Sequence, residues 1–270
     1  LVMLSRDVPV AAPAGALALR DPDADALLAF LRDMEFTTLT TRIAKVLGVT
    51  GAAPAKAAAA APGEVAAAAD ALIDRGAYEV VRDAAALKIW IARAIDIGAV
   101  AVDAETTSLD EMVADLVGIS LCVEPGKACY IPLIHKTHSA DDLFGSDDLA
   151  EGQMQTEEAL RMLTPVLTDP SVIKIGQNMK YDSKIFAQVG IAVAPIDDTM
   201  LMSYALNSGI HNHGMDTLSE RYLSHVPIPI KELLGTGKSA ITFDKVAIDK
   251  AVGYAAEDAD ITLRLWHIFK

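Results

Sequence analysis

The stretch from Ala99 to Thr106 constrains the fold of this chain more than any other. Its small and β-branched residues predict a buried central strand that ends in two acids, Asp103 and Glu105. Because side chains alternate faces along a strand, both carboxylates point the same way, roughly 6.5–7 Å apart. Two carboxylates on one face repel each other unless a cation lies between them, which indicates a metal site. The alternative is a strand that runs out into a solvated acidic loop.

Length and charge limit the classes of protein that this chain can belong to. Its 270 residues allow one good-sized domain and a smaller one. A net charge of −14 makes it a poor general nucleic-acid binder, but does not exclude a nucleic-acid enzyme whose metals supply local positive charge. The chain begins at Leu1, so we expect it to be a piece of a longer protein.

Cysteine use and apolar runs bear on the location of the protein. Cys122 and Cys129 are the only cysteines, and Pro125-Gly126 predicts a hairpin turn that lets them face each other as reduced thiols. No basic leader and no apolar run of membrane-spanning length are found. We therefore expect a cytoplasmic protein without a membrane partner.

The N-terminal part predicts a helical segment followed by a linker. Asp21 and Pro22 are expected to start a helix that extends to about Met34. The Ala- and Pro-rich stretch 51–63 is of low complexity and is expected to separate two domains. The dense apolar patterns begin at about residue 64.

From there the patterns predict a meander of antiparallel strands and then alternating strands and helices, which is typical of a mixed α/β sheet flanked by helices. The expected strands cover 78–81, 99–106, 116–123, 128–133 and 172–176. The expected helices cover 66–74, 84–97, 156–168, 180–189, 198–206, 215–223 and most of 244–268.

Two further groups of polar residues lie where chemistry is expected. Asn178 follows a strand as a candidate N-cap and shares the first turn of a helix with Asp182. Tyr254 and Asp258 share one face of the last helix, whereas Glu257 and Asp260 are expected to face away from Asp258. The plain alternatives are a capped helix with surface acids and a solvated acidic turn.

These two groups and the acids of the 99–106 strand follow one another in the chain in the same order as the motifs of the DEDD 3′→5′ exonuclease superfamily, and the sequence resembles its tyrosine-bearing subgroup. Within that subgroup it resembles the proofreading exonuclease domain of bacterial DNA polymerases I. This resemblance covers about residues 76–270 and implies an RNase H-like fold with a mixed five-stranded sheet. The motifs that carry it are Val102–Thr106 with Ser108–Asp110, Gly176–Asn178 with Asp182, Gly214–Leu223, Gly235–Lys238 with Thr242-Phe243, and Tyr254–Asp260.

The resemblance implies catalytic roles for Asp103, Glu105, Asp182, Tyr254 and Asp258. Asp103, Glu105 and Asp258 would hold one divalent metal ion, and Asp103 with Asp182 a second, either Mg²⁺ or Mn²⁺. Tyr254 and Glu105 would orient the attacking water. The implied product is a nucleoside 5′-monophosphate.

The resemblance also implies contacts to a single-stranded or frayed DNA 3′ end from Thr106, Leu109, Asn178, Tyr181 and Ile230. Ile230 stands where some relatives carry an aromatic residue.

The same resemblance predicts the domain organisation. Residues 1–50 resemble the C-terminal end of a 5′-nuclease domain, 51–63 form the linker, and 64–270 form the exonuclease domain. A polymerase domain in cis is the implied partner in the full-length protein, and we expect a monomer.

Two other functions remain open from the sequence. One is a ribonuclease D-like enzyme that trims RNA 3′ ends with the same chemistry. The other is a catalytically silent domain that only positions DNA. Such silent domains lose the acids, whereas all four are present here.

Overall fold

A computed structural model describes residues 21–34, 36–49, 72–137 and 148–270 of the chain. The chain divides into two compact units, Leu1–Ala61 and Pro62–Lys270. The expected linker, 51–63, lies outside the described residues. Of the helix expected over 66–74, residues 66–71 also lie outside them. Residues 72–74 are described and are not helical, so that expected helix does not reach Asp74.

The first unit contains two helices, α1 (Ala24–Asp33) and α2 (Thr37–Val46). The N-cap of α1 is Asp23, whose carboxylate accepts a hydrogen bond from the amide of Ala26 at 3.0 Å. The expected cap at Asp21 is therefore wrong, because Pro22 precedes the cap instead of following it. Leu28 and Leu31 form the buried stripe of α1.

The second unit is built on a six-stranded sheet in the order β1-β4-β3-β2-β5-β6. The three central strands, β4, β3 and β2, are antiparallel, whereas β1, β5 and β6 each pair parallel with a neighbour. The expected mixed sheet is confirmed. The strands are β1 (Glu79–Val80), β2 (Ala99–Thr106), β3 (Leu116–Glu124), β4 (Lys127–Pro132), β5 (Ile173–Gly176) and β6 (Ile196–Asp198).

The expected number of five strands is wrong by one, because β6 was not predicted. This strand has only three residues, two of them acids, so it carries no apolar alternation that a sequence pattern could reveal. It is defined by its parallel pairing with β5, from Lys174 opposite Ile196 to Gly176 opposite Asp198.

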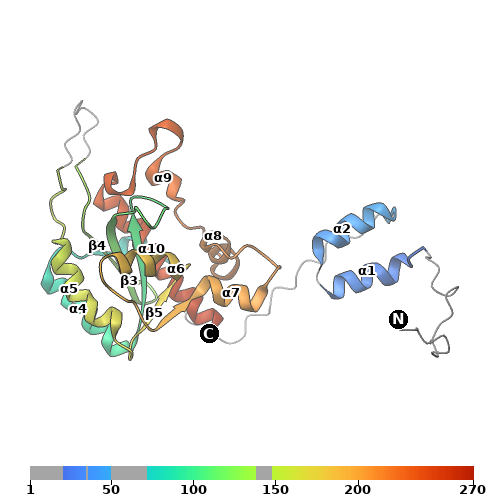
Figure 1. Ribbon diagram of the computed structural model, residues 1–270, viewed down its shortest axis with the longest axis horizontal. Coiled ribbons are helices and arrows are strands. Elements are labelled where there is room, and N and C mark those ends of the chain that lie inside the picture. Colours follow the sequence, from blue (N-terminus) through green and yellow to red (C-terminus); the bar gives the residue numbers. More distant parts are fainter. Residues whose placement is uncertain (1–20, 35, 50–71, 138–147) are drawn as a thin grey trace, which may run out of the picture. The chain divides into compact units, whose positions relative to one another are not determined.

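One face of the sheet is covered by α4 (Ala84–Ile97) and α5 (Thr156–Thr168), which lie side by side in Figure 1. Trp90 and Leu163 from these helices share one apolar core with Val100 and Val102 of β2. Gly98 ends α4 in the left-handed conformation at φ 75°, so that the chain turns directly into β2.

The other face is covered by the long C-terminal helix α10 (Ile248–Phe269). This helix begins at Ile248, four residues later than the expected start at residue 244, because Phe243–Lys245 form the short 3₁₀ turn η5. Ala256 and Ala259 of α10 pack against Ala101 of β2, and such small side chains let the helix approach the sheet closely. Asp103 and Glu105 point toward this face, since they alternate with Val102 and Ala104.

The remaining helices connect these layers. The helix expected over 215–223 is two elements, because α8 passes into a π-helical turn, η3. Among the described helices, none has the length and apolar character that spanning a bilayer requires. The connecting elements are η2 (Arg75–Ala77), α6 (Met179–Gln188), α7 (Thr199–Asn207), α8 (Met215–Leu218), η3 (Ser219–Leu223), α9 (Ile230–Leu234) and η4 (Gly237–Ser239).

The two cysteines do not face each other, contrary to expectation. Cys122 is paired with Ala128 and Cys129 with Leu121, so the cysteines are one position out of register. One residue along a strand reverses the face, and the two thiols therefore lie in different apolar cores, both buried and free.

Candidate active site

Three carboxylates from two elements converge between β2 and α10. Asp103 and Glu105 come from β2, and Asp258 comes from the middle of α10. One oxygen of each carboxylate lies within 4.8 Å of the oxygens of the other two. Glu105 and Asp258 are each 8% exposed and Asp103 is half-buried, so this acidic group is largely shielded from solvent.

Burial and mutual repulsion disfavour the charged forms of these acids. Burial raises the pKa of Asp103 from 3.8 to about 6. Burial, with the charges of neighbouring carboxylates adding to it, holds the pKa values of Glu105 and Asp258 well above their usual range. Atom Oε1 of Glu105 has no hydrogen-bond partner among the described residues, although it is buried.

A divalent cation fits this donor set. The three side chains offer only oxygen ligands, which hard cations such as Mg²⁺ and Mn²⁺ prefer. A cation would also neutralise the repulsion and provide a partner for the unpaired oxygen of Glu105.

Asp182 lies next to this group, in the first turn of α6. Its Oδ1 accepts a hydrogen bond from the backbone amide of Ala104 at 3.2 Å, so it reaches β2 between Asp103 and Glu105. Asp182 is 2% exposed, and burial followed by the charge of Asp103 raises its pKa well above the usual range. It is not a member of the group of three that lies within 4.8 Å.

Tyr254 lies one helical turn before Asp258 and points to the same site. Its phenol lies near the carboxylates of Asp258, Glu105 and Asp103, which all act on its pKa. Burial, then the negative charges of Asp258, Glu105 and Asp103, raise the pKa of this phenol far above its ordinary value. The hydroxyl therefore stays protonated at neutral pH.

Two of the residues expected to bind substrate are joined to each other. Thr106 ends β2, and its Oγ1 lies 2.5 Å from the hydroxyl of Tyr181 on α6. Both hydroxyls also lie within hydrogen-bond distance of the carbonyl of Ser108, at 3.0 and 2.5 Å, so one hydroxyl donates to this carbonyl and the other donates to its neighbour. The side chain of Leu109, which follows, is 94% exposed. This arrangement fixes the start of the loop after β2 and leaves Leu109 free to contact a ligand.

The other two expected substrate residues are less closely tied to the carboxylates. Ile230 begins α9 and is 40% exposed, and no described hydrogen bond or ring contact joins it to the acids. Asn178 precedes α6 in the left-handed conformation at φ 63°, and its side chain makes no cap hydrogen bond. The expected side-chain cap is therefore wrong.

Asp198, which the sequence reasoning missed, does the capping. Its carboxylate accepts from the amides of Asn178 and Met179 at 3.2 and 2.8 Å, and from those of Met200 and Leu201 at 2.9 and 3.2 Å. One acid therefore stabilises the starts of both α6 and α7. Only the pairing of β6 with β5 brings it there, so no local signal could have revealed this role for α6.

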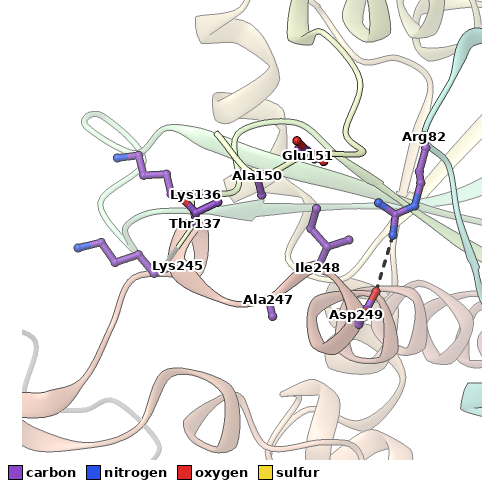
Figure 2. Close-up of a pocket in the computed structure, with 9 residues that line it drawn as sticks. All are labelled: Arg82, Lys136, Thr137, Ala150, Glu151, Lys245, Ala247, Ile248 and Asp249. Carbon is purple, nitrogen blue, oxygen red and sulfur yellow. Dashed lines mark ion pairs between the residues drawn. The ribbon is translucent and has the colours of Figure 1, made fainter. Parts of the chain in front are cut away.

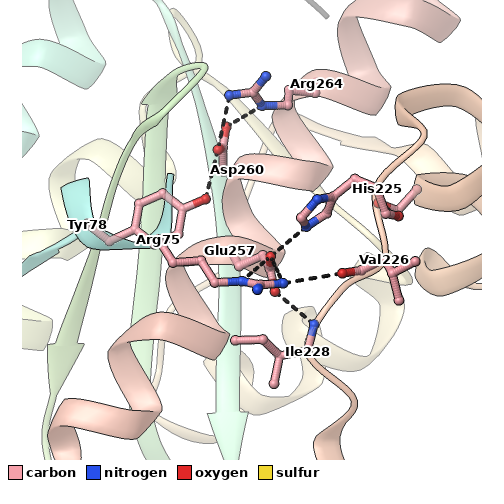
Figure 3. Close-up of polar contacts among 9 residues, drawn as sticks. Arg75, Tyr78, His225, Val226, Ile228, Glu257, Asp260 and Arg264 are labelled. Carbon is pink, nitrogen blue, oxygen red and sulfur yellow. Dashed lines mark hydrogen bonds and ion pairs between the residues drawn. The ribbon is translucent and has the colours of Figure 1, made fainter. Parts of the chain in front are cut away.

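Glu257 faces away from Asp258, as expected, but it is buried and not solvated. Its carboxylate accepts from Nε of Arg75 at 2.7 Å, from the amide of Ile228 at 2.9 Å, and contacts Nε2 of His225 at 2.7 Å (Figure 3). Arg75 also donates to the carbonyl of Val226 at 3.2 Å. Glu257 thus holds the segment that leads into α9.

Asp260 forms a second buried network on another side of α10. It accepts from the hydroxyl of Tyr78 at 2.9 Å, from the amide of Gly126 at 2.9 Å and from Nε of Arg264 at 2.8 Å (Figure 3). The solvated acidic turn that was the alternative interpretation is therefore excluded. A sequence signal existed, because buried apolar residues surround these acids on every side of the helix.

A separate hollow of about 340 Å³ lies at the N-terminal end of α10 (Figure 2). Arg82, Lys136 and Lys245 line it together with Glu151 and Asp249. Arg82 is offset by Asp249, whose carboxylate lies 3.7 Å from the guanidinium. The hollow contains none of the expected site residues, and its mixed charge does not favour a ligand of either sign.

Comparisons with known proteins agree with this geometry. A family described as 3′-5′ exonuclease matches residues 78–270. DNA polymerase I of Rhizobium leguminosarum is 40% identical over 332 aligned positions, which cover 100% of this chain and 32% of that protein. DNA polymerase I of Pseudomonas aeruginosa is 35% identical, covering 98% of this chain and 27% of that protein. The chain thus spans about a third or less of the length of these relatives.

Solved structures show the same fold at low sequence identity. Escherichia coli RNase D, an exoribonuclease involved in structured RNA processing, superposes with a TM-score of 0.50 at 19% identity, over 71% of this chain and 45% of that one. The catalytic core of RRP6 from Trypanosoma brucei gives a TM-score of 0.51 at 12% identity, over 71% of this chain and 45% of that one. The fold is therefore the RNase H-like fold of exonucleases.

Proposed function

The chain belongs to the 3′-5′ exonuclease family, and on that premise we propose that it hydrolyses the 3′-terminal phosphodiester of DNA as the proofreading domain of a DNA polymerase I. The observation that carries the proposal is the group of converging carboxylates Asp103, Glu105 and Asp258, which lies within the matched residues. The product is a nucleoside 5′-monophosphate, released one at a time.

We assign two divalent ions, Mg²⁺ or Mn²⁺, to these acids. Asp103, Glu105 and Asp258 hold one, and Asp103 with Asp182 holds the other, in keeping with the position of Asp182 beside Ala104. When bound, such ions lower the pKa of water and stabilise charge on the attacking and leaving oxygens of a phosphodiester. The four carboxylates neutralise these ions and fix their places.

Tyr254 orients the attacking water. Its hydroxyl keeps its proton because its pKa is raised, so it directs the water by hydrogen bonding and does not act as a base. The Asp258 carboxylate lies close to the phenol and is one of the causes of the raised pKa. Glu105, which has an unpaired oxygen on the same site, accepts a hydrogen bond from the water.

Thr106, Leu109, Asn178, Tyr181 and Ile230 receive the terminal nucleotide. The linked hydroxyls of Thr106 and Tyr181 form a fixed polar edge, and the exposed side chain of Leu109 offers apolar contact to a base. A terminal nucleotide must leave its stack to reach buried acids, so single-stranded and frayed ends are the favoured substrates.

The similarity to DNA polymerases I supports three further assignments. We assign residues 1–50 to the end of a 5′-nuclease domain and 64–270 to the exonuclease domain. A polymerase domain follows in the full-length protein, which acts on DNA in the cytoplasm as a monomer. Sedimentation of the purified full-length protein tests the last assignment.

A nuclease assay with matched substrates tests the function. Single-stranded DNA labelled at its 5′ end should shorten one nucleotide at a time with Mg²⁺ and not with EDTA. Asp103→Asn should abolish shortening, whereas Asp115→Asn, at an exposed acid outside the carboxylate group, should not.

The same assay distinguishes the two alternatives. An RNA strand of the same sequence that is shortened faster than the DNA would favour a ribonuclease D-like activity. If neither strand is shortened under any metal condition, the domain is catalytically silent and the proposal is overturned.

A further inference from the structure

Apart from Asp258, one turn further on, the side chains of α10 near Tyr254 do little to fix its ring. The residues beside and before it on the helix are small: Ala251, Gly253 and Ala255. Such side chains leave space around a phenol, and a Cβ added at Gly253 would meet no atom within 4 Å. The position of the Tyr254 hydroxyl must therefore depend on residues from other elements.

Phe243 provides such a contact. It lies in η5, before α10 begins, and its ring centroid is 6.0 Å from that of Tyr254, with the planes tilted by 53°. Phe243 is 3% exposed and shares one apolar core with Val246, Ala251 and Ala255. Rings in this arrangement attract each other beyond the effect of burial alone.

Phe243 is itself held by a buried histidine. The ring of His135 lies 6.0 Å from that of Phe243, and that of Tyr130 lies 5.7 Å from His135 on its other side. Nδ1 of His135 is 2.8 Å from the carbonyl of Val246, and a carbonyl can only accept, so Nδ1 carries the proton. Nε2 then accepts from the hydroxyl of Tyr130, also at 2.8 Å.

These hydrogen bonds define one protonation state of His135. A neutral imidazole with its proton on Nδ1 satisfies both hydrogen bonds, because Nδ1 donates and Nε2 accepts. Burial lowers the pKa of His135, which favours the same neutral form. The imidazole is therefore fixed at both ends, and the ring of Phe243 packs against a rigid neighbour.

The backbone around these residues is joined as well. The amide of Lys136 donates to the carbonyl of Asp244 at 2.7 Å, and the two side chains form an ion pair at 3.2 Å. These contacts tie η5 to the segment after β4. Tyr130 on β4 is opposite Ser120 on β3, which is opposite Asp103 on β2. A continuous set of bonded elements thus connects Phe243 to the strand that carries the site.

We propose that Phe243 is a positioning residue for Tyr254, and that the row Tyr130–His135–Phe243 directs the Tyr254 hydroxyl toward Asp258. This inference rests on the proposed exonuclease function. No described hydrogen bond or ring contact joins Phe243 to the acids or to the expected substrate residues, so its ring contact with Tyr254 is the contact on which the inference rests.

A double-mutant cycle in the nuclease assay tests this role. Phe243→Leu should lower kcat about tenfold and leave KM nearly unchanged, because a small misplacement of a catalytic group is costly. In a Tyr254→Phe background, which lacks the hydroxyl, Phe243→Leu should cause no further loss of kcat. If the two losses multiply, or if Phe243→Leu alone leaves kcat unchanged, the positioning role is overturned.

A matched control separates positioning from general loss of a buried ring. Phe269 packs edge-on against Tyr222 with centroids 5.0 Å apart, at the far end of the same helix. Phe269→Leu should lower the melting temperature and leave kcat unchanged. An equal loss of kcat in both variants would show that Phe243 supports the fold and not the hydroxyl.

A measurement without metal keeps the inference separate from the proposed function. In EDTA, the losses of melting temperature caused by Phe243→Leu and Tyr254→Leu should be less than additive, because the two rings contact each other. If the wild-type chain releases no nucleotide, the proposed function fails, and this stability cycle still tests the contact. Additive losses would overturn the contact itself.

Discussion

Asp182 of α6 accepts a hydrogen bond from the backbone amide of Ala104, which lies on β2 between Asp103 and Glu105. This bond brings a helix and a strand together at one residue, with acids on both sides of it. Asp182 is buried and lacks a described cation partner, so the bond fixes the position of a carboxyl group whose charged form is disfavoured by burial and by the charge of Asp103, as its raised pKa shows. A site arranged in this way predicts several measurable properties.

The first prediction concerns the function and stability of the acids together. Asp258→Asn should remove nucleotide release almost completely, because a ligand of the first metal ion is lost. The same change should raise the melting temperature in EDTA at pH 7.5, because it removes one buried charge from a group that repels. Asp115→Asn is the exposed control. A lower melting temperature for Asp258→Asn in EDTA would contradict the repulsion.

The second prediction concerns pH. Burial raises the pKa of Asp103 in the folded state to about 6, whereas its ordinary pKa is 3.8. Between these values the folded state binds more protons than the unfolded chain, so its stability falls as pH rises through this window. In EDTA, the melting temperature of wild type relative to Asp103→Asn should therefore fall between pH 4.5 and pH 7.5. A constant difference would show that burial does not shift this pKa.

The third prediction concerns metal binding. Mg²⁺ should raise the melting temperature of the wild-type chain at pH 7.5, because it binds the folded acids and relieves their repulsion. The increase should be smaller at pH 5, where protons compete for the same carboxylates. Differential scanning calorimetry with and without Mg²⁺ measures both values. A melting temperature that does not respond to Mg²⁺ or Mn²⁺ at either pH would count against the metal site.

The fourth prediction concerns the phenol. Tyr254→Phe should lower kcat about 10²-fold, as expected for a positioned group that handles protons in the transition state. The variant retains the ring and all the acids, so the shift of melting temperature with Mg²⁺ should equal that of wild type. Full activity of Tyr254→Phe would remove the hydroxyl from the mechanism.

The fifth prediction concerns Asp260, which the sequence predicts to face away from Asp258. Asp260→Ala should remove the buried carboxylate to which Tyr78, the amide of Gly126 and Nε of Arg264 donate, and cost about 3–5 kcal/mol of stability. Denaturant unfolding measures this loss. The rate per folded molecule should remain near that of wild type, because Asp260 is not in the carboxylate group. A specific loss of rate would place Asp260 in the site.

Local spacing alone determined several features of the site. The alternation along β2 placed Asp103 and Glu105 on one face, and the i, i+4 spacing on α10 placed Tyr254 beside Asp258. Both relationships depend only on the geometry of one regular element. The order of the motifs was sufficient to predict the fold class and the family, whereas the catalytic roles of the residues remain predictions.

Tertiary structure alone decided which of the other acids are buried and what they bind. Glu257 and Asp260 have partners that are 182 residues away in the sequence, Arg75 and Tyr78, and Asp198 reaches Asn178 only through the pairing of β6 with β5. Phe243 meets Tyr254 because η5 is bonded to the segment after β4. Sequence periodicity reports which face of an element a residue occupies. It contains no information on which distant segment packs against that face, because long-range packing and pairing fix that.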